Sequence, residues 1–563
     1  MFKRLKKTAD ESDWLRDKQR RTTVSEMSTG TQLHLVWFKR DLRVADHAPL
    51  AAAVAASNRE RRGAVLGLYV IEPEVIGAED FAARHWEAAA GALEELRGAL
   101  RELDLPLAIR KGGVVALFEK LRAGLVAAGG ALTVWSHEET GNAVTFARDR
   151  AVGKWAREQG VRWTEFPQNG VVRRLRSRDG WAQVWNERMD APVVRTPDKG
   201  GARPWPLKEA GDIPTAGDLG LAADACEKRQ LATRAEGWRL LESFLGHRGK
   251  NYNREMSSPL TAAESCSRLS LALCYGTLSM KEIAQASLRR LAELQQLRKS
   301  GTPEEFRIGA LRAFVARLHW HCHFMQKLES EPRIEFTAFV PGLDALRGGE
   351  WSAGHAEKLA AWAEGRTGYP FIDACMRSLR STGWINFRMR AMLMSFASYD
   401  LWLPWRRSGL HLARLFTDYE PGIHWPQVQM QSGTTGINTL RMYSPVKQSH
   451  DQDGEGVFIR RWVPELAAVS AAFLHEPWRM PTMEQERSGC VVGRDYPRPV
   501  VDHAEAVKFA RASFTVARRS ADVRAATGEV LRKHGSRKRS GRKSAGSAPT
   551  GLLSVELELD LGG

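Results

Sequence analysis

The chain has 563 residues and a net charge of +17, and 43% of its residues are hydrophobic. This length exceeds what one hydrophobic core supports and predicts about two to four domains. No apolar run approaches the ~20 residues of a membrane span, and no apolar segment follows the basic amino terminus, which excludes membrane and secreted classes and predicts a cytoplasmic protein.

The positive charge favours a polyanionic partner such as a nucleic acid. Residues 1–30 carry +3 and residues 511–563 carry +6, which leaves +8 for the body between them. Basicity is therefore partly a property of the folded body, as binding to nucleic acid requires.

The amino-terminal part alternates between strand and helix patterns. Residues 1–30 have the composition of a disordered leader, and Met27 is an alternative start. Short apolar runs at 33–38, 64–70 and 132–135 predict buried parallel strands, and residues 82–103 and 114–128 predict helices. This alternation predicts an α/β domain with a doubly wound, Rossmann-like parallel sheet over residues 31–165.

The rest of the chain divides by composition. Periodicity fades over residues 166–235, where prolines, glycines and charges predict an interdomain connector. Helical patterns dominate residues 236–505 and predict an all-α domain. Residues 506–563 are basic and contain a run rich in Gly and Ser, which predicts a disordered tail that adds non-specific affinity for DNA.

A polar segment, Cys266-Ser267-Arg268-Leu269-Ser270, precedes an apolar helix that we expect to begin near Leu269. Exposed N–H groups at a helix amino terminus, with hydroxyls and an arginine beside them, suit a pyrophosphate. Such a segment is more often only a helix cap, so the pattern by itself leaves both interpretations open.

Neither the histidines nor the cysteines predict a metal site. His319, His321 and His323 alternate along a predicted helix, where they would spread too far around the axis to share one ion. The six cysteines are scattered and form no C-x-x-C pair, which argues against zinc, an iron–sulfur cluster and a disulfide framework. We expect no bound metal.

The segment 368–466 interleaves charges with apolar residues at helical spacing. Arg388 and Arg390 precede Asp418 and Glu420, and charges on such apolar elements need partners or ligands. Four tryptophans lie in the same stretch, namely Trp384, Trp402, Trp405 and Trp425. Core packing is the common role for each one alone, so the argument rests on the combination.

Taken together, these motifs resemble those of the photolyase and cryptochrome family, over residues 33–500. The matching motifs are Phe38-Lys39-Arg40-Asp41-Leu42-Arg43, Gly368-Tyr369-Pro370, Ser381-Thr382-Gly383-Trp384, Arg388 and Arg390, Asp418-Tyr419-Glu420, and the closing run 458–466. The resemblance implies an α/β domain followed by a helical domain that binds flavin adenine dinucleotide (FAD).

The resemblance also implies which residues contact FAD. They are Tyr252, Cys266, Ser267, Arg268, Leu269, Ser270, His321, Arg390, Asp418, Tyr419, Glu420 and His424. Arg390 and Asp418 would form an ion pair beside the flavin ring, where a cation stabilises the anionic reduced form. His424 would face flavin N5, commonly an asparagine position in repair enzymes, and would change charge near neutral pH. Alternatively, His424 is a packed loop residue.

For damaged DNA, the resemblance implies contacts from Arg317, Trp320, Phe387, Arg388, Met430 and Gln448. Trp320 and Arg388 match a pocket for a flipped-out pyrimidine dimer, in which Trp320 would stack beside the damaged bases. Arg317, Phe387 and Met430 replace a glutamate, an asparagine and a second stacking tryptophan. The pocket therefore follows neither the standard pattern for cyclobutane dimers nor that for the 6-4 photoproduct.

The implied catalytic residues are Trp320, Trp405 and His424. Trp405 matches the middle of three tryptophans that carry electrons to the flavin, whereas the position nearest the flavin aligns with Val428. Either Trp425, Trp402 or another aromatic residue replaces it, or photoreduction of the flavin is slow. The family's α/β domain often holds an antenna pigment, a folate or a deazaflavin, and here His137-Glu138-Glu139-Thr140 stands where folate-binding members have an Asn-Glu pair.

Our hypothesis from the sequence is an FAD-dependent photolyase that repairs cyclobutane pyrimidine dimers in DNA under blue light. The alternative is a cryptochrome-type photoreceptor without repair activity, which the altered dimer pocket and the long tail favour. The sequence leaves the oligomeric state open.

Overall fold

The computed structural model describes residues 30–348 and 351–535 and begins with a five-stranded parallel sheet in the order β3-β2-β1-β4-β5. The strands are β1 (Gln32–Phe38), β2 (Gly63–Ile71), β3 (Leu107–Lys111), β4 (Ala131–His137) and β5 (Arg162–Phe166). The three predicted strands are confirmed as β1, β2 and β4. β3 and β5 were not predicted, because each is only five residues long and carries charged residues.

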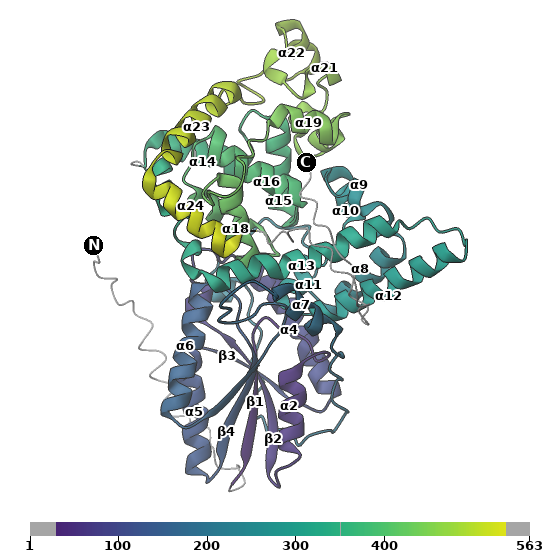
Figure 1. The fold of residues 1–563 in the computed structure, drawn as a ribbon, viewed down its shortest axis with the longest axis vertical. Helices are drawn as coiled ribbons and strands as arrows, with labels where there is room; N and C mark the ends of the chain where they lie inside the picture. The colour runs from purple at the N-terminus through teal and green to yellow at the C-terminus, as the bar shows by residue number, and fades with distance from the viewer. Residues whose placement is uncertain (1–29, 349–350, 536–563) are drawn as a thin grey trace, which may run out of the picture.

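Helices cover both faces of the sheet (Figure 1). They are α2 (Ala48–Ser57), α3 (Pro73–Ile76), α4 (Ala83–Glu102), α5 (Val114–Ala127) and α6 (Ala143–Glu158). Alternate side chains of β1 point to opposite faces: Leu35 and Trp37 pack in the core under α5 and α6, and Val36 and Phe38 in the core under α2 and α4. The predicted doubly wound α/β domain is confirmed.

The connector is largely irregular but contains one helix, α7 (Trp181–Asp190), which packs against α12. Its buried residues Trp181, Trp185 and Met189 recur every four residues, so they lie along one face of the helix. The fading periodicity of residues 166–235 did not predict this short helix, because the pattern lasts less than three turns.

The second domain is almost entirely helical, as predicted, and lies above the carboxyl edge of the sheet in Figure 1. Its helices are α8 (Arg234–Gly246), α9 (Tyr252–Glu255), α10 (Pro259–Ser265), α11 (Ser270–Tyr275), α12 (Met280–Lys299), α13 (Ile308–Ser330), α14 (Ala353–Glu364), α15 (Pro370–Thr382), α16 (Phe387–Ser395), α17 (Trp405–Leu415), α18 (Pro421–Ser432), α19 (Pro445–Asp453), α20 (Val457–Trp462), α21 (Ala471–Leu474) and α22 (Thr482–Ser488). One π-helical turn, Phe396–Asp400, follows α16.

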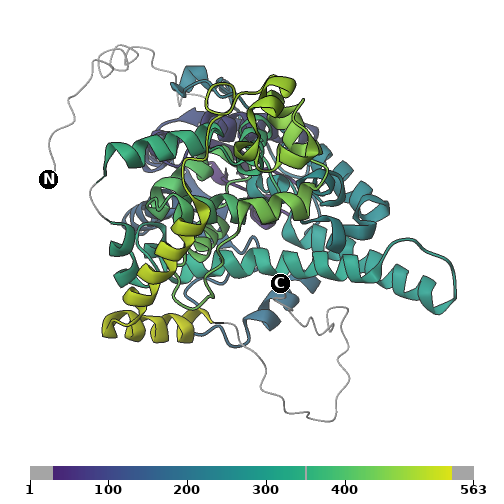
Figure 2. The ribbon, with the colours of Figure 1, turned by 90° about the horizontal axis from the view of Figure 1, so that it is seen from above.

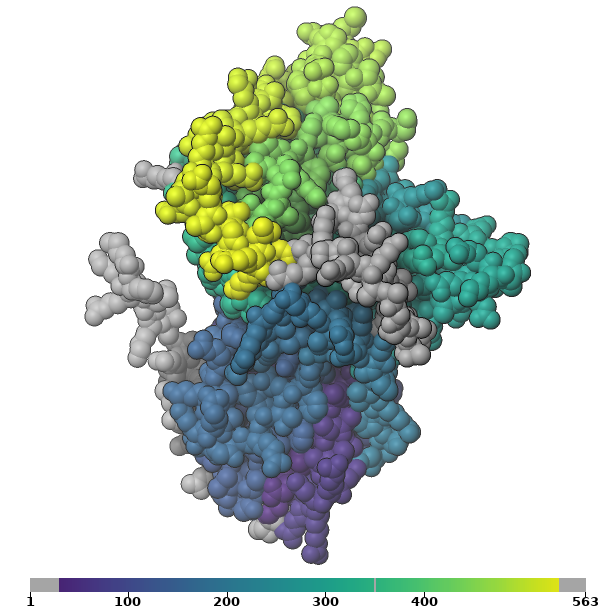
Figure 3. Space-filling view, viewed as in Figure 1, coloured from purple at the N-terminus to yellow at the C-terminus, as the bar shows by residue number. Residues whose placement is uncertain are grey.

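The prediction of a disordered tail from residue 506 is wrong for the residues up to 535. Helices α23 (His503–Arg518) and α24 (Ala521–His534) pack against the helical domain, and both appear in yellow along its outside in Figures 2 and 3. Phe514 and Val530 are buried with Tyr399 and Phe339. The sequence analysis did not detect the apolar stripe of these two helices, because the stripe is narrow and many charged residues surround it. The predicted leader (residues 1–29) and residues 536–563 lie outside the described residues.

Candidate functional site

The domain junction is organised around the loop that follows β1. The Arg40 guanidinium donates to the Cys274 carbonyl (2.9 Å) and pairs with Glu420 (2.8 Å), so it links the sheet edge to α11 and α18. Burial by itself would lower the pKa of Arg40, but the neighbouring Cys274 and Glu420 raise it above its ordinary value. Arg43 donates to the Gly276 carbonyl at 2.8 Å and adds a second link. The loop therefore fixes the two domains together.

The predicted ion pair of Arg390 and Asp418 is present. Two nitrogens of Arg390 contact the two oxygens of Asp418 at 3.1 and 2.9 Å, and Arg390 Nε donates to the Ile385 carbonyl. Burial would raise the pKa of Asp418, but Arg390 and the Ser270 hydroxyl hold it below its ordinary value. The Arg390 guanidinium also lies 4.2 Å from the Phe416 ring centre. This pair is a preorganised charge site in an apolar surround.

The segment before α11 lies beside this pair. α11 begins at Ser270, close to the predicted start, and Arg268 adopts a left-handed backbone with φ of 60°. The Arg268 guanidinium stacks on Trp384 at 3.9 Å, and burial lowers its pKa to about 10, which still leaves it charged at neutral pH. A cation, the Ser270 hydroxyl and the first N–H groups of α11 thus gather near Asp418, an arrangement that suits a phosphate.

Several other predicted residues converge on the same region. Burial raises the pKa of Tyr252, a buried side chain whose electrostatic neighbours are Cys266 and Arg317. Cys266 in turn has Arg268, Arg317 and Arg390 as its neighbours. His321 and Glu420 line one pocket with Arg40 at the domain junction. Ser267 and Leu269 belong to the segment before α11, where the Leu269 N–H lies 3.5 Å from the Ser267 hydroxyl.

Buried polar atoms without partners test whether these residues fit a bound cofactor. Within the described part of the chain, four predicted site residues carry such an atom: Arg268 Nε, His321 Nδ1, Arg388 Nε and Gln448 Oε1. Gln431 on α18 has both amide atoms buried and unpaired in the same way, and α18 packs against α13 and α16. Leaving such atoms unpaired costs free energy, so Arg268 Nε and His321 Nδ1, which belong to residues predicted to contact FAD, fit a polar ligand.

His424 lies in α18 rather than in a loop, and its expected change of charge near neutral pH is not met. Its Nε2 donates to the Gly409 carbonyl at 2.9 Å, and burial lowers its pKa to about 4. Its ring is surrounded by Phe416, Tyr419 and Trp425. His424 is therefore a neutral histidine, with Nδ1 left as an acceptor.

Tyr419 differs from its expected role, because its hydroxyl donates to Asp80 at 2.6 Å and so turns toward the α/β domain. Its backbone carbonyl accepts hydrogen bonds from Arg40 and from Cys274. In this conformation, Tyr419 stabilises the domain junction, and the side chains on either side of it, Asp418 and Glu420, carry the charge at the site.

A pair of tryptophans bridges α17 and α18. The rings of Trp405 and Trp425 lie 6.0 Å apart in an edge-to-face arrangement, and Trp405 Nε1 donates to Asp344 at 3.0 Å. Trp425 is fully buried beside His424. Trp402 packs instead against Phe509 and Phe514. Of the two candidates to replace the aromatic side chain missing at Val428, only Trp425 contacts Trp405.

The residues predicted to contact DNA lie on α13, α16, α18 and α19. Arg317 and Phe387 are exposed, and the Arg317 guanidinium lies 5.7 Å from the Phe387 ring centre. Trp320, Arg388 and Met430 are half-buried, whereas Gln448 is buried. Trp320 packs on its own helix against His323 and Phe324. The contact between Arg317 and Phe387 joins α13 to α16 at the surface.

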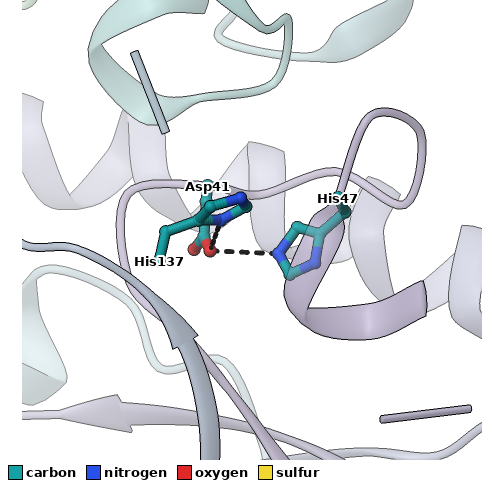
Figure 4. A group of neighbouring side chains, drawn as sticks. All are labelled: Asp41, His47 and His137. Carbon is teal, nitrogen blue, oxygen red and sulfur yellow. Dashed lines mark hydrogen bonds and ion pairs between the residues drawn. The ribbon is translucent and has the colours of Figure 1, made fainter. Parts of the chain in front are cut away.

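Asp41, His47 and His137 form a buried cluster at the carboxyl ends of β1 and β4 (Figure 4). One oxygen of Asp41 accepts from His47 Nε2 (3.0 Å) and from His137 Nδ1 (2.7 Å). The spacing resembles a metal site, but His47 Nδ1 accepts from the Leu50 N–H, so Nε2 carries the proton and cannot bind a metal in this state. The cluster is a hydrogen-bonded network that caps α2.

Glu139 lies in the segment compared with folate-binding members, and both of its carboxylate oxygens already accept hydrogen bonds. Arg148 pairs with one of its oxygens at 2.5 Å, and the N–H groups of Thr140 and Gly141 donate to the other. Arg148 also pairs with Glu72 and Asp149. An antenna pigment bound through this carboxylate would have to break these bonds.

Sequence reasoning did not predict several residues of the site. The partner of Arg40 is 380 positions away, so no local pattern indicated the pair. None of the helices in residues 30–348 and 351–535 combines the length and apolarity that crossing a membrane demands.

Comparisons with known proteins agree with this architecture. Residues 34–180 match the DNA photolyase family model, and residues 314–516 match the model described as the FAD binding domain of DNA photolyase. The deoxyribodipyrimidine photo-lyase of Escherichia coli is 29% identical over 507 residues, covering 86% of this chain and 99% of that protein. Cryptochrome-1 of Sinapis alba is 30% identical over 501 residues, covering 84% of this chain and 94% of that protein.

In fold, the chain is similar to a bacterial class III photolyase from Agrobacterium tumefaciens, with a TM-score of 0.73 at 22% identity, over 88% of this chain and all of that one. The relatives include both photolyases and cryptochromes. The two matched models, the extent of these similarities and the charge site beside α11 lead to one conclusion. The chain belongs to the photolyase and cryptochrome family and contains that family's FAD-binding domain.

Proposed function

We propose that the protein is a photolyase that repairs cyclobutane pyrimidine dimers in DNA, with FAD as its cofactor. When bound, FAD supplies light absorption and transfer of a single electron. The observation that carries the proposal is that the charged FAD site and an exposed cationic, aromatic surface share α13 and α16.

The residues proposed to hold FAD form two groups, one that would bind its phosphates and one that would contact its flavin ring. Arg268, Ser270 and the start of α11 would bind the pyrophosphate, since they combine a cation, a hydroxyl and free N–H groups. Arg390, fixed by Asp418, would place a positive charge near the ring and favour its anionic reduced form. Neutral His424 would offer a hydrogen-bond acceptor at Nδ1 without adding charge.

For DNA, Arg317 and Arg388 would contact phosphates, while Phe387 and Trp320 offer aromatic faces for unstacked bases. Met430 would contact the lesion through apolar atoms, and it would stack on the bases more weakly than a tryptophan does. The proposed pocket therefore differs from one in which two tryptophans face the lesion.

A second candidate function is a photoreceptor that uses the same flavin without repair. The observation that favours it is the packing of α23 and α24 on the helical domain, where His503 pairs with Asp400 of the π-helical turn. A change in that turn would reach the carboxyl-terminal helices directly. We rank repair first because the exposed Arg317 and Phe387 have no evident use in a protein that does not bind a nucleic acid.

The deciding experiment is repair of an oligonucleotide that carries one cyclobutane thymine dimer, under blue light and in the dark, with flavin-loaded protein. We expect restored thymines only in the light. An Arg388→Ala variant should lose repair at low DNA concentration while keeping its flavin. If the loaded wild-type protein reduces its flavin in the light but restores no thymine, the photoreceptor is correct and repair is excluded.

A further inference from the structure

The family's α/β domain often holds an antenna pigment, and in this fold the carboxyl edge of the sheet is the expected place for one. β1 lies between β2 and β4, so the crevice at the ends of β1 and β4 is the topological switch point, where open α/β sheets bind ligands. The segment compared with folate-binding members, residues 137–140, begins at the end of β4. The proposed function uses no residue of this edge, so its fitness for a pigment is a separate question.

A network of buried ion pairs fills this edge. Arg148 of α6 pairs with Glu72 at 2.7 Å and with Glu139 at 2.5 Å. It also contacts one oxygen of Asp149 at 2.9 Å, and Lys39 holds the other oxygen at 2.9 Å. None of these five side chains is more than 11% exposed, and none has a buried polar atom without a partner in the described chain. Opening the network would leave several charges buried and unpaired, which is strongly destabilising.

The network also covers the aromatic surface that a pigment would need. Trp37 is 1% exposed, and Lys39 and Arg148 both lie over its ring, at 4.6 and 4.8 Å from the ring centre. The Phe118 ring packs against Trp37 at 5.4 Å in an edge-to-face arrangement. A folate or a deazaflavin presents a flat ring system, which binds best against an open aromatic face. Trp37 is therefore closed to such a ring by side chains of its own domain.

The space that remains between this edge and the helical domain is too small for a pigment. The cavity there, lined by Lys39, Glu139 and His321 among others, has a volume of about 30 Å³, which is room for about two water molecules. Pockets for ligands of pigment size have roughly 300–1,000 Å³. Of the residues that line the cavity, His321 alone has a buried polar atom without a partner, and His321 is one of the predicted FAD contacts. The α/β side of the cavity thus offers a pigment neither space nor a buried unpaired group.

The loop after β4 is closed by its own hydrogen bonds. The Glu138 N–H donates to the carbonyl of the last residue of β5 at 2.8 Å, and the Glu139 carbonyl accepts from Arg173 at 2.7 Å. At the end of the loop, the Ala143 N–H donates at 2.8 Å to Glu335, a buried carboxylate in the 3-10 turn Pro332–Glu335 of the helical domain. The loop therefore joins the two domains, and these groups are not available to a pigment.

We propose that this protein binds no antenna pigment and that FAD is its only light-absorbing cofactor. The side chains at the carboxyl edge of the sheet bind one another and the helical domain in the place where a pigment would lie. The wavelength dependence of any light-driven step then follows the absorption of FAD alone. This inference goes beyond the proposed function and holds for a photolyase and for a photoreceptor.

The test is equilibrium dialysis of the full-length, FAD-loaded protein in the dark against methenyltetrahydrofolate, 8-hydroxy-5-deazariboflavin or additional FAD. We expect no saturable binding of any of the three, and a flavin content that stays at one per chain. A second measurement detects a pigment retained from the expression host, because heating the freshly purified protein releases its chromophores for chromatography. FAD should be the only pigment released. One equivalent of a further pigment in either measurement would overturn the proposal.

Arg148→Ala tests whether the network is a fixed part of the core. It removes three ion pairs at once, so we expect the melting temperature to fall by roughly 5–10 °C while the flavin content stays unchanged. The matched control is Lys154→Ala on the same helix, because Lys154 is 72% exposed and its loss should change the melting temperature by less than about 2 °C.

A wild-type melting temperature in Arg148→Ala would mean that Arg148 can leave the edge of the sheet freely, and this would contradict the proposal. If the variant yields no folded protein, the dialysis of the wild type decides alone. None of these experiments measures repair, so their outcome is independent of the proposed photolyase activity.

Discussion

At the scale of single residues, the charge at the proposed FAD site depends on one ion pair. Asp418 is almost fully buried, and its carboxylate is stable there only because Arg390 binds both of its oxygens. Removing one partner of a buried pair leaves the other charge without compensation, which costs about 3–5 kcal/mol. The pair therefore contributes to the stability of the folded protein as well as to binding of a ligand.

We predict that Arg390→Ala lowers both flavin content and melting temperature. The loss of FAD should exceed tenfold in affinity, because the cation beside the ring and the geometry of Asp418 disappear together. Flavin absorbance per chain after gel filtration measures the effect. Arg377→Ala, which breaks a similar pair with Glu465 elsewhere in the domain, should keep its flavin. Equal flavin content in the two variants would remove Arg390 from the site.

The pKa of His424 predicts a dependence of stability on pH. Its folded pKa of about 4 lies below the ordinary value of 6.5, so the unfolded chain binds the extra proton first as the pH falls. The contribution is fully present above pH 6.5 and is lost on acidification toward pH 4, by up to about 3 kcal/mol. In urea titrations over this range, wild type should lose more stability than His424→Asn. Parallel pH profiles would show that folding does not lower the pKa of His424.

At the scale of elements, α17 and α18 place Trp405 and Trp425 in contact, whereas the backbone at Trp402, with φ of 56°, directs that ring toward α23. We infer that electrons pass through Trp425, because its ring is the one in contact with Trp405. We predict that Trp425→Phe and Trp405→Phe each slow photoreduction of bound flavin tenfold or more, while Trp402→Phe leaves the rate unchanged. Transient absorption of the loaded protein measures all three. A normal rate in Trp425→Phe would mean that electrons reach the flavin by another path.

Helix α23 offers a matched pair of phenylalanines. Phe514 is fully buried against Tyr399 and Trp402, whereas Phe509 is 55% exposed although it also touches Trp402. We predict that Phe514→Ala costs about 3–5 kcal/mol and that Phe509→Ala costs much less, because only Phe514 leaves a cavity. Thermal melting compares the two variants. Similar melting temperatures would show that α23 contributes no core.

At the scale of the whole molecule, Arg40 couples the two domains through Glu420, a buried carboxylate whose pKa is raised by burial. We predict a coupling of about 1–3 kcal/mol in a double-mutant cycle of Arg40→Ala and Glu420→Gln, measured by thermal unfolding. The exposed pair Arg195 and Asp198 should show no measurable coupling. Additive effects of the first two substitutions would mean that the domains are held together by other contacts.

Local patterns in the sequence determined much of this protein. Continuous apolar runs predicted β1, β2 and β4, and motif resemblance indicated the Arg390–Asp418 pair and the segment before α11. The strands and the start of α11 were predicted correctly because strand burial and helix starts are encoded over short distances. The same approach missed α23 and α24, since a narrow apolar stripe among many charges becomes visible only when a partner surface covers it.

Tertiary structure alone decided the remaining features. In the folded protein, Arg40 pairs with Glu420, and Trp425 rather than Trp402 is the neighbour of Trp405. His424 is buried, and its lowered pKa keeps it neutral. The fold also brings Lys39, Glu139 and Arg148 into one buried network. Each of these outcomes depends on the distance and dielectric between residues far apart in the chain, which no local pattern contains.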